Sequence, residues 1–489
     1  MAKRVSVIDI GSNSIRMATY EKTSRFAFHL INETKSKVRI SEDTYKNNGN
    51  LQEIPMQRAY DALENFLTIS KSLKARKILC VATSALRDAP NKKIFLHKVR
   101  KNLKLNIKTI DGSKEAYFGS LACANLLPEQ DNALSIDIGG GSTEFSIING
   151  KNISNIVSLK LGTVRLKELF FDTNEIEKAH KYIDEKLKVL DELAPDTLIG
   201  IGGTFRAVSS AIKTMNNYPL DKLHAYEYST EILNTFLDSI INSNSEDELK
   251  DLHIKSNRID VIKPGVLILM RVLKKLNSLK SVITSGVGVR EGVYLADMLR
   301  TSNAKMPVNY NTSVRYIIDS NILDTSFSNQ LNGLTKKIFD LTHQKFNIDK
   351  KYRTLVAISA KLYPAGANIH YYSNNLHSYY LIRTALEYGF THNDIMLIAT
   401  LVKYSKNKLP SKSHVAKYSE LLPEVEVVNY LSFVLSLSIS LLKHRPLNID
   451  FEVEFTKNQL IINSKNNLYL AKEALLKLEK IKDLEILFR

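Results

Sequence analysis

The chain has 489 residues, which is too long for a single hydrophobic core, so two to four domains are expected. Hydrophobic residues make up 44% of the sequence and charged residues 24%, a composition typical of soluble globular proteins that excludes a disordered chain. Lys and Arg outnumber Asp and Glu by 68 to 51, and the formal charge of +17 favours an anionic partner about as well as it fits a lysine-rich solvated surface. No nucleic-acid-binding motif is present, so polyphosphate or a nucleotide is expected rather than a nucleic acid.

The first predicted element is a β-hairpin over residues 5–19. Residues 1–9 lead directly into its first strand, which leaves no room for a signal peptide. The strand ends at Asp9, the tip is Gly11-Ser-Asn-Ser14, and the residues after the tip have the composition of a second strand. A P-loop or dinucleotide-binding loop would lead into a helix instead. The tip can still bind phosphate, because glycine lets backbone N–H groups approach an anion and the serine hydroxyls add donors.

A helix, a strand and a turn follow the hairpin. Apolar residues recur at helical spacing over residues 56–73, and residues 77–83 have the composition of a strand. The turn at residues 83–91 opens the next helix and places Arg87 near a helix start at the mouth of the same sheet. A guanidinium group there could clamp a phosphate, but alone it would more often form a surface salt bridge.

Residues 106–116 predict a strand, a turn and the start of a helix. Glu115 lies in the first turn of this helix, where a carboxylate either complements the helix dipole or acts in catalysis. Its position alone favours the dipole role.

A second hairpin, over residues 134–148, repeats the design of the first. Its strand delivers Asp137 to a Gly-Gly-Gly-Ser tip, and Glu144 follows on the returning strand. One such loop is more often an ordinary hairpin, but two copies 128 residues apart (137 minus 9) favour a pair of phosphate loops. A carboxylate beside a phosphate requires a cation between them, and Mg²⁺ prefers a few carboxylates with water and phosphate oxygens. Asp9, Asp137 and Glu144 are therefore the candidate magnesium ligands.

Three further segments, at residues 159–171, 197–209 and 282–294, each predict a strand, a glycine turn and a helix. Together with the two hairpins, this pattern resembles sugar kinases, heat-shock chaperones and actin, in which two related α/β domains enclose a ligand cleft. We therefore expect an α/β fold with two actin-like (ribonuclease H-like) domains, at residues 1–124 and 125–302.

Five motifs are specific enough to indicate a family. They are Asp9-Ile-Gly-Ser-Asn-Ser-Ile-Arg16, Ala82-Thr-Ser-Ala-Leu-Arg-Asp-Ala-Pro-Asn91, Gly112-Ser-Lys-Glu-Ala116, Asp137-Ile-Gly-Gly-Gly-Ser-Thr-Glu144 and Ser285-Gly-Val-Gly-Val-Arg-Glu-Gly292. In this order they resemble the exopolyphosphatase and guanosine pentaphosphate phosphatase (Ppx/GppA) family over roughly the first 300 residues. The resemblance implies a hydrolase that removes the terminal phosphate from a phosphoanhydride chain.

The resemblance also implies roles for individual residues. Glu115 matches the family's catalytic glutamate, which activates or orients the attacking water, and this outweighs the preference from position alone. Arg87 matches an arginine that reaches the phosphates, and two acids match those linked to magnesium, Asp137 and Glu144. The two phosphate loops match at Gly11, Ser12, Asn13, Ser14, Gly139, Gly140, Gly141 and Ser142. Lys114 stands where many members have a second acid, and a neighbouring cation would favour the charged form of Glu115.

The pattern after residue 302 predicts a helical domain over residues 303–446. It resembles the HD-type domain of longer family members, in which a His-Asp or His-Glu pair binds metal. This chain has Tyr363-Pro364 in place of the pair and Ser405 in place of a later histidine, so the metal site is degenerate and a second metallophosphatase centre is not expected. Two histidines that remain are interpreted as structural or substrate-contacting residues rather than metal ligands, His370 and His377.

Other features of the C-terminal third have two interpretations. Four lysines cluster on one loop and helix end, and they are Lys403, Lys406, Lys408 and Lys412. Such a cluster suits a basic surface along which a polyanionic substrate binds, but it is equally common on a solvated face. The domain could instead supply a dimer surface. Residues 425–442 are the longest apolar stretch, but polar residues interrupt it, so a buried helix is predicted rather than a membrane span. Residues 447–489 predict a small α+β C-terminal domain of two strands and a closing helix.

The two cysteines, Cys80 and Cys123, lie inside apolar stretches. This favours buried thiols in a reducing cytoplasm over a disulfide or a metal pair.

Three functions are compatible with these residues. The favoured one is a cytoplasmic, Mg²⁺-dependent exopolyphosphatase, with a homodimer expected from the resemblance. A guanosine pentaphosphate (pppGpp) phosphatase of the stringent response would use the same catalytic residues, and one enzyme could do both. The alternative of another class is a nucleotide-gated regulatory protein of the actin-like fold without hydrolysis, and Glu115 counts against it.

Overall fold

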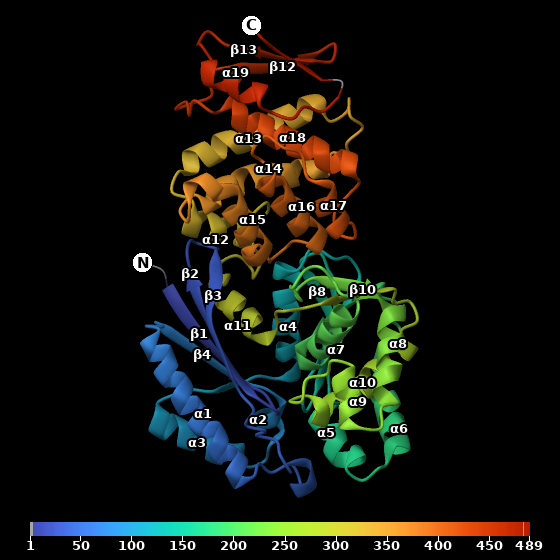
Figure 1. Ribbon diagram of the computed structural model, residues 1–489. Coiled ribbons are helices and arrows are strands. Elements are labelled where there is room, and N and C mark those ends of the chain that lie inside the picture. Colours follow the sequence, from blue (N-terminus) through green and yellow to red (C-terminus); the bar gives the residue numbers. More distant parts are fainter. Residues whose placement is uncertain (1–2, 483) are drawn as a thin grey trace. The chain divides into compact units, whose positions relative to one another are not determined.

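The computed structural model describes residues 3–482 and 484–489 (Figure 1). The prediction that the start of the chain leads directly into the first strand falls partly on residues 1–2, which lie outside this range. Contacts within the chain define two compact units, Met1–Tyr310 and Asn311–Arg489. The finer predicted division, at residues 124, 302 and 446, stays a prediction.

The first sheet of unit 1 has the strand order β3-β2-β1-β4-β5. Strand β2 runs antiparallel to β1 and β3, whereas β4 and β5 continue the sheet in parallel. The strands are β1 (Lys3–Ile10), β2 (Ile15–Lys22), β3 (Phe28–Ser36), β4 (Lys77–Ala82) and β5 (Lys108–Thr109). The helices between and after them are α1 (Glu53–Ser72), α2 (Ser84–Asp88), α3 (Lys92–Leu103) and α4 (Gly112–Leu126).

The second sheet has the order β10-β11-β9-β6-β7-β8. Its strands are β6 (Ala133–Ile138), β7 (Thr143–Asn149), β8 (Asn152–Leu159), β9 (Thr197–Ile201), β10 (Tyr226–Ser229) and β11 (Ser281–Thr284). Its helices are α5 (Thr163–Leu166), α6 (Ile176–Leu187), α7 (Gly202–Met215), α8 (Thr230–Ile241), α9 (Glu246–Asp251), α10 (Ile259–Lys275) and α11 (Val289–Met298).

The two sheets repeat one arrangement. Each sheet contains an antiparallel hairpin, β1–β2 or β6–β7, and a third antiparallel strand pairs with the second strand of that hairpin. Two parallel strands extend the sheet from the first strand of the hairpin. They are β4 and β5 in one sheet and β9 and β11 in the other. This confirms two mixed α/β lobes, each beginning with a hairpin. The first lobe comprises the sheet of β1–β5, and the second lobe comprises the sheet of β6–β11.

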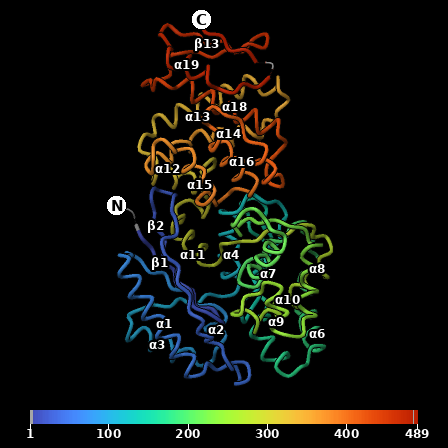
Figure 2. The backbone as a smooth tube through the Cα atoms, viewed as in Figure 1, coloured from blue at the N-terminus to red at the C-terminus, as the bar shows by residue number. Residues whose placement is uncertain are grey.

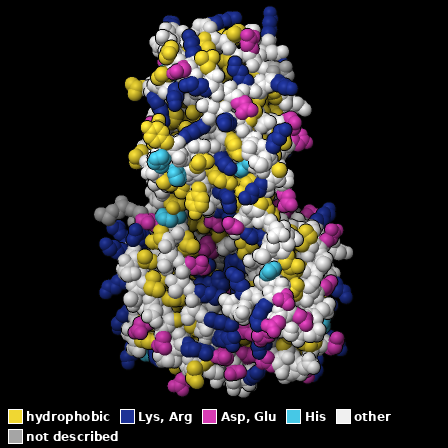
Figure 3. All heavy atoms as spheres, in the orientation of Figure 1, with side chains coloured by type: hydrophobic (Ala, Val, Ile, Leu, Met, Phe, Trp, Pro, Cys, Tyr) yellow, Lys and Arg dark blue, Asp and Glu magenta, His cyan; other side chains and the backbone are white. Residues whose placement is uncertain are grey.

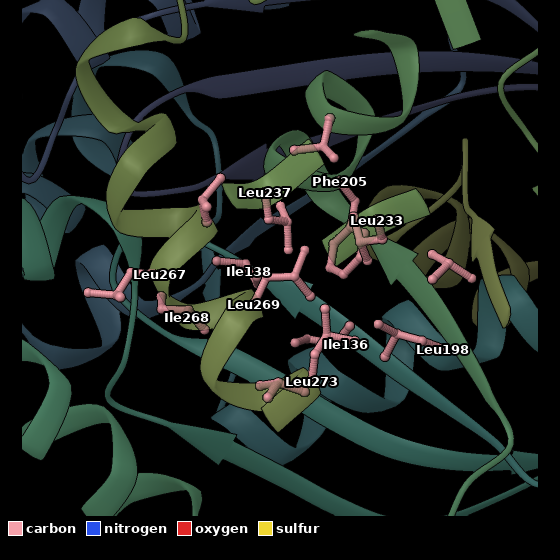
Figure 4. Close-up of a cluster of buried hydrophobic side chains, with 14 of the residues drawn as sticks. Ile136, Ile138, Leu198, Phe205, Leu233, Leu237, Leu267, Ile268, Leu269 and Leu273 are labelled. Atoms are coloured by element: carbon pink, nitrogen blue, oxygen red, sulfur yellow. The ribbon is translucent and has the colours of Figure 1, made fainter. Parts of the chain in front are cut away.

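Apolar side chains on both faces of the second sheet explain why helices cover it. Ile136 and Ile138 of β6 pack with Leu198 of β9, Phe205 of α7 and Leu269 of α10 in a buried cluster (Figure 4). Helix α4 packs on β6, β7 and β8 of the second sheet, and α11 lies beside α4 and also contacts β1 of the first sheet (Figure 2). The lobes are therefore joined by a packed helix pair as well as by the chain itself.

Unit 2 begins with a helical part, as predicted. Its helices are α12 (Thr312–Asn321), α13 (Thr325–Thr342), α14 (Tyr352–Leu362), α15 (Asn374–Ala385), α16 (His392–Lys403), α17 (Lys412–Lys417) and α18 (Val425–Leu441). Helix α18 is largely buried, which confirms the prediction for this apolar stretch. Within the described part of the chain, no helix has the length and apolar character needed to cross a bilayer.

The chain does not close on a helix. After β12 (Glu452–Thr456), β13 (Gln459–Asn463) and α19 (Tyr469–Leu476), strand β14 (Glu485–Phe488) pairs parallel to β13. The sequence prediction ended with the helix and was wrong on this point, because a short apolar run such as Ile486-Leu-Phe488 has no periodicity that separates strand from helix. Both cysteines are buried free thiols.

Candidate active site

The two predicted loops are hairpins of equal length. In the first, Ile10 pairs with Ile15 and Asp9 with Arg16, and in the second, Ile138 pairs with Thr143 and Asp137 with Glu144. The same backbone hydrogen bond closes both tips, from Gly11 N to Ser14 O at 3.2 Å and from Gly139 N to Ser142 O at 2.9 Å. The repeat seen in sequence is therefore a repeat of backbone geometry.

The loops of the two lobes contact each other. A Cβ atom on Gly140 would lie 2.8 Å from the Cβ of Ser12, so glycine is required for this approach. One cavity contains most of the predicted site residues, which are Asp9, Gly11, Ser12, Asn13, Ser14, Glu115, Asp137, Gly139, Gly140, Ser142 and Glu144. Two predicted residues do not line it, Arg87 and Gly141.

Arg87 belongs to the site through Glu115. Its Nη1 donates to Oε2 of Glu115 at 2.7 Å, and both side chains are mostly buried. Glu115 lies in the first turn of α4, as predicted, after the N-cap Asp111. Arg87 lies in the short α2, three residues after its start and one residue before its end, and Pro90 stops this helix from continuing.

The carboxyl groups of Glu115 and Glu144 are both protonated more readily than an ordinary glutamate. Burial, then the neighbouring charge of Glu144, raises the pKa of Glu115 well above its usual range, and Arg87 opposes this. Burial and Asp137 raise the pKa of Glu144 to about 8, although Ser158 donates a hydrogen bond to it at 2.8 Å. Lys114 is exposed, so its expected lowering of the Glu115 pKa does not decide the direction.

Burial also raises the pKa values of the two aspartates at the strand ends, against the opposing charges of nearby arginines. Burial raises the pKa of Asp9 to about 6 against the opposing effect of Arg290, and burial also raises the pKa of Asp137. Oδ1 of Asp9 is buried without a hydrogen-bond partner. These acids fit a divalent cation, which would neutralise them.

A cation here would also need ligands from outside the protein. Among the residues that the structure describes, no three His, Cys, Asp or Glu side chains form a metal-binding group. Mg²⁺ accepts such an incomplete set, because it keeps several waters and phosphate oxygens beside one or two carboxylates.

Four arginines line the same cavity, and none of them is among the site residues predicted from the sequence. They are Arg16 on β2, Arg206 on α7, Arg258 before α10 and Arg290 on α11. Burial and their mutual repulsion lower the pKa of three of them, Arg206 and Arg258 to about 10. On the face seen in Figure 3, Lys and Arg side chains gather in a hollow of unit 1. We name Arg16, Arg206, Arg258 and Arg290 the arginine cluster.

The signals for the arginine cluster in the sequence are uneven. Arg16 and Arg290 belong to motifs already singled out, at the end of the first hairpin motif and within Gly-Val-Arg-Glu-Gly, so their positions could have marked them. Arg206 follows the Gly-Gly-Thr turn after β9, whereas Arg258 stands in a segment without a motif. Only the fold brings Arg258 to the site, where a Cβ on Gly203 would collide with its guanidinium.

Family models match both units. The Ppx/GppA phosphatase family matches residues 18–301, and domain III of that family matches residues 311–483. A bifunctional 3-dehydroquinate synthase/phosphatase of Fusobacterium nucleatum is 34% identical over 285 residues, which are 54% of this chain and 42% of the relative. The chain thus spans less than half the length of that relative.

Other similar proteins match this chain over most of their own length. A guanosine-5'-triphosphate,3'-diphosphate pyrophosphatase of Photobacterium profundum is 26% identical over 83% of this chain and 81% of its own. Among solved structures, an exopolyphosphatase from Cytophaga hutchinsonii has a TM-score of 0.57 and 25% identity, covering 62% of this chain and 100% of that one. The Ppx/GppA family member of Aquifex aeolicus has a TM-score of 0.53 and 27% identity, covering 62% and 99%.

Proposed function

Because the chain belongs to the Ppx/GppA phosphatase family, we propose that it is an exopolyphosphatase that hydrolyses the terminal phosphoanhydride bond of inorganic polyphosphate. The observation that carries the proposal is the buried Glu115, which lines the cavity between the two hairpin loops and is paired with Arg87 behind it. The loops present backbone N–H groups and hydroxyls to phosphates, and the carboxylate is available to a water.

Hydrolysis of a phosphoanhydride needs positioning and charge neutralisation more than covalent help. In the proposed reaction, Glu115 accepts a proton from the attacking water or holds it in line with the leaving oxygen. Arg87 favours the charged form of Glu115 that this role requires. Arg87 would also bind the transferred phosphate.

Mg²⁺ is part of the proposal, held by Asp137 and Glu144 with Asp9 close to it. When bound, the ion would supply positive charge to the phosphate oxygens. The raised pKa values of these acids and the unpartnered Oδ1 of Asp9 support this assignment.

The arginine cluster supports a substrate with several phosphates. Buried arginines that repel one another are stabilised by a bound polyanion, because it provides the missing counter-charge. A guanosine pentaphosphate phosphatase is the second candidate, since two relatives named guanosine-5'-triphosphate,3'-diphosphate pyrophosphatase align with this chain over 81% and 95% of their own length. The same residues would act in either reaction.

Three further assignments belong to this proposal and rest on the family resemblance. They are an HD-type fold for the helical part of unit 2 without a working metal centre, a homodimer and a cytoplasmic location. The match of unit 2 to domain III of the family supports the first.

The test is orthophosphate release by the purified chain with Mg²⁺, comparing long-chain polyphosphate with guanosine pentaphosphate. Glu115→Gln removes the base but keeps the volume, and Glu64→Gln on the exposed face of α1 is the matched control. Faster release from polyphosphate that only Glu115→Gln abolishes supports the exopolyphosphatase. A preference for the nucleotide selects the second candidate, and no release from either substrate would leave the non-hydrolytic regulatory protein.

A further inference from the structure

A second cavity, of about 300 Å³, lies behind the phosphate loops in unit 1. It is lined by the segment that connects β3 to α1, by the start of α2 and by the chain around α5. Ser84 lines both this cavity and the candidate active site. We name it the rear cavity.

Two hydroxyl groups in the rear cavity have no partner. Ser41 and Thr44 line it and are 0% and 4% exposed, and neither hydroxyl makes a hydrogen bond within the protein. A buried hydroxyl without a partner is unfavourable, and a side-chain rotation that turned either group into the cavity would pair it with an acceptor on a bound ligand.

The charge of the lining is positive. Lys160 and Arg165 line the rear cavity together with the single acid Asp88. Asp88 is already paired, since Arg165 contacts it at 3.3 Å and Arg87 at 3.4 Å. Lys160 is exposed at the outer end. An anion fits this lining better than a neutral or cationic molecule.

Only side chains and one loop separate the two cavities. The hydroxyls of Ser12 and Ser84 are hydrogen-bonded at 3.1 Å. Gly141 lies against them and against Tyr45, because an added Cβ would be 2.5 Å from the Tyr45 hydroxyl and 2.7 Å from that of Ser84. Arg165 contacts the Tyr45 ring from the rear side, 4.3 Å from its centroid, and donates to Gly141 O at 2.9 Å. Ser84 lines both cavities, and Tyr45 lines the rear cavity beside Gly141.

We propose that the rear cavity binds inorganic phosphate, the product of the reaction, and is the route by which it leaves. This rests on the proposed function. Orthophosphate forms beside Glu115, and a shortened chain that stays bound occupies the front of the active-site cavity. The product then has to leave on the other side of the loops, where Ser41, Thr44 and Lys160 would receive it.

The first test is binding of inorganic phosphate measured by calorimetry. The protein is the full chain with Glu115→Gln, which does not cleave its substrate, saturated with long-chain polyphosphate and Mg²⁺. We expect phosphate to bind while the polyphosphate stays bound. Lys160→Gln should weaken this binding about tenfold, as expected for one lost charge-assisted contact, and Lys160→Arg should restore it. Lys274→Gln, at an exposed lysine of α10 that does not line the cavity, should bind phosphate as the parent chain does.

The second variant tests the buried hydroxyl. Thr44→Val should also weaken phosphate binding, whereas Thr335→Val in α13, a buried threonine that also lacks a hydrogen-bond partner, should not. Phosphate that displaces polyphosphate, or binds equally well to Lys160→Gln, overturns the rear site. Failure of the chain to bind polyphosphate would instead contradict the proposed function. In that case phosphate binding by the chain alone, with and without Lys160→Gln, still decides the rear site.

Discussion

At the scale of single residues, the Arg87–Glu115 salt bridge opposes the protonation of the proposed base, which burial and Glu144 favour. Glu115 and Arg87 could be recognised as site residues only because they belong to family motifs. Position alone favoured a helix-dipole role for Glu115 and a surface salt bridge for Arg87. The pKa of Glu115 could not be predicted from sequence, since it depends on burial and on Glu144 from the other lobe. The neighbouring Lys114 predicted a lowered pKa for Glu115, whereas the structure raises it.

Loss of Arg87 should shift the pH dependence of the reaction. Arg87→Gln removes the group that lowers the pKa of Glu115, so this pKa rises further and the charged base forms only at higher pH. We expect kcat/KM at pH 7 to fall at least tenfold and to recover in part near pH 9. A pH profile of kcat/KM whose rise stays at the parent position would contradict the role of Arg87.

The acids near the proposed magnesium site should make stability depend on pH and metal. Their pKa values are higher in the folded than in the unfolded chain, so the metal-free folded chain binds more protons. The free energy of unfolding therefore decreases as pH rises from about 4 through about 6 for Asp9 and about 8 for Glu144.

Thermal unfolding measures this directly. Mg²⁺ should raise Tm more at pH 8.5 than at pH 5.5, because the carboxylates are then charged. Glu144→Gln should reduce the Mg²⁺ effect and stabilise the metal-free chain at pH 8.5, while Glu64→Gln should change neither. An equal Mg²⁺ effect at both pH values would argue against carboxylate ligands.

At the scale of elements, the two hairpins were predictable and their contact was not. Period-two strands and Gly/Ser tips specify a hairpin locally, whereas the contact between Ser12 and Gly140 joins residues of different lobes. Strand β14 was missed for a related reason, because its pairing with β13 and not its own pattern makes it a strand.

The contact between the loops predicts a strong effect of one methyl group. Gly140→Ala places a Cβ 2.8 Å from that of Ser12 and 3.3 Å from Val164, so the loops must separate. A displacement near 1 Å in an active site costs about 100-fold, and we expect this loss in kcat/KM. Gly333→Ala in α13, where nothing lies within 4 Å, is the matched control and should keep activity while raising stability by about 0.5–1 kcal/mol. Activity of Gly140→Ala near that of the parent would show that the loop contact is not needed.

At the scale of the whole molecule, the net charge fitted an anionic partner and a lysine-rich surface equally well, and it gave no location for a binding site. The arginine cluster is formed by residues 16, 206, 258 and 290, which are too far apart in the chain for any spacing rule. The mixed sheets of unit 1 were predictable because each lobe repeats one pattern. The arginines were not, because they meet only when both lobes and α11 are in place.

The arginine cluster should affect substrate binding more than the chemical step. Arg258→Gln is expected to raise KM for long-chain polyphosphate about tenfold, because one charged contact to the substrate is lost, with a smaller change in kcat. Arg300→Gln, at an arginine with 72% of its side chain exposed, is the control. A fall in kcat with KM unchanged would place Arg258 in the chemical step instead.

The central claim is that Glu115 directs a water molecule to the terminal phosphorus of a phosphoanhydride chain. The most direct test is a single turnover of long-chain polyphosphate in ¹⁸O-water with Mg²⁺, followed by mass spectrometry of both products. The account predicts one labelled oxygen in the released orthophosphate, none at the new chain end, and loss of the reaction in Glu115→Gln. Label at the end of the shortened chain, or an equal yield from Glu115→Gln, would contradict it.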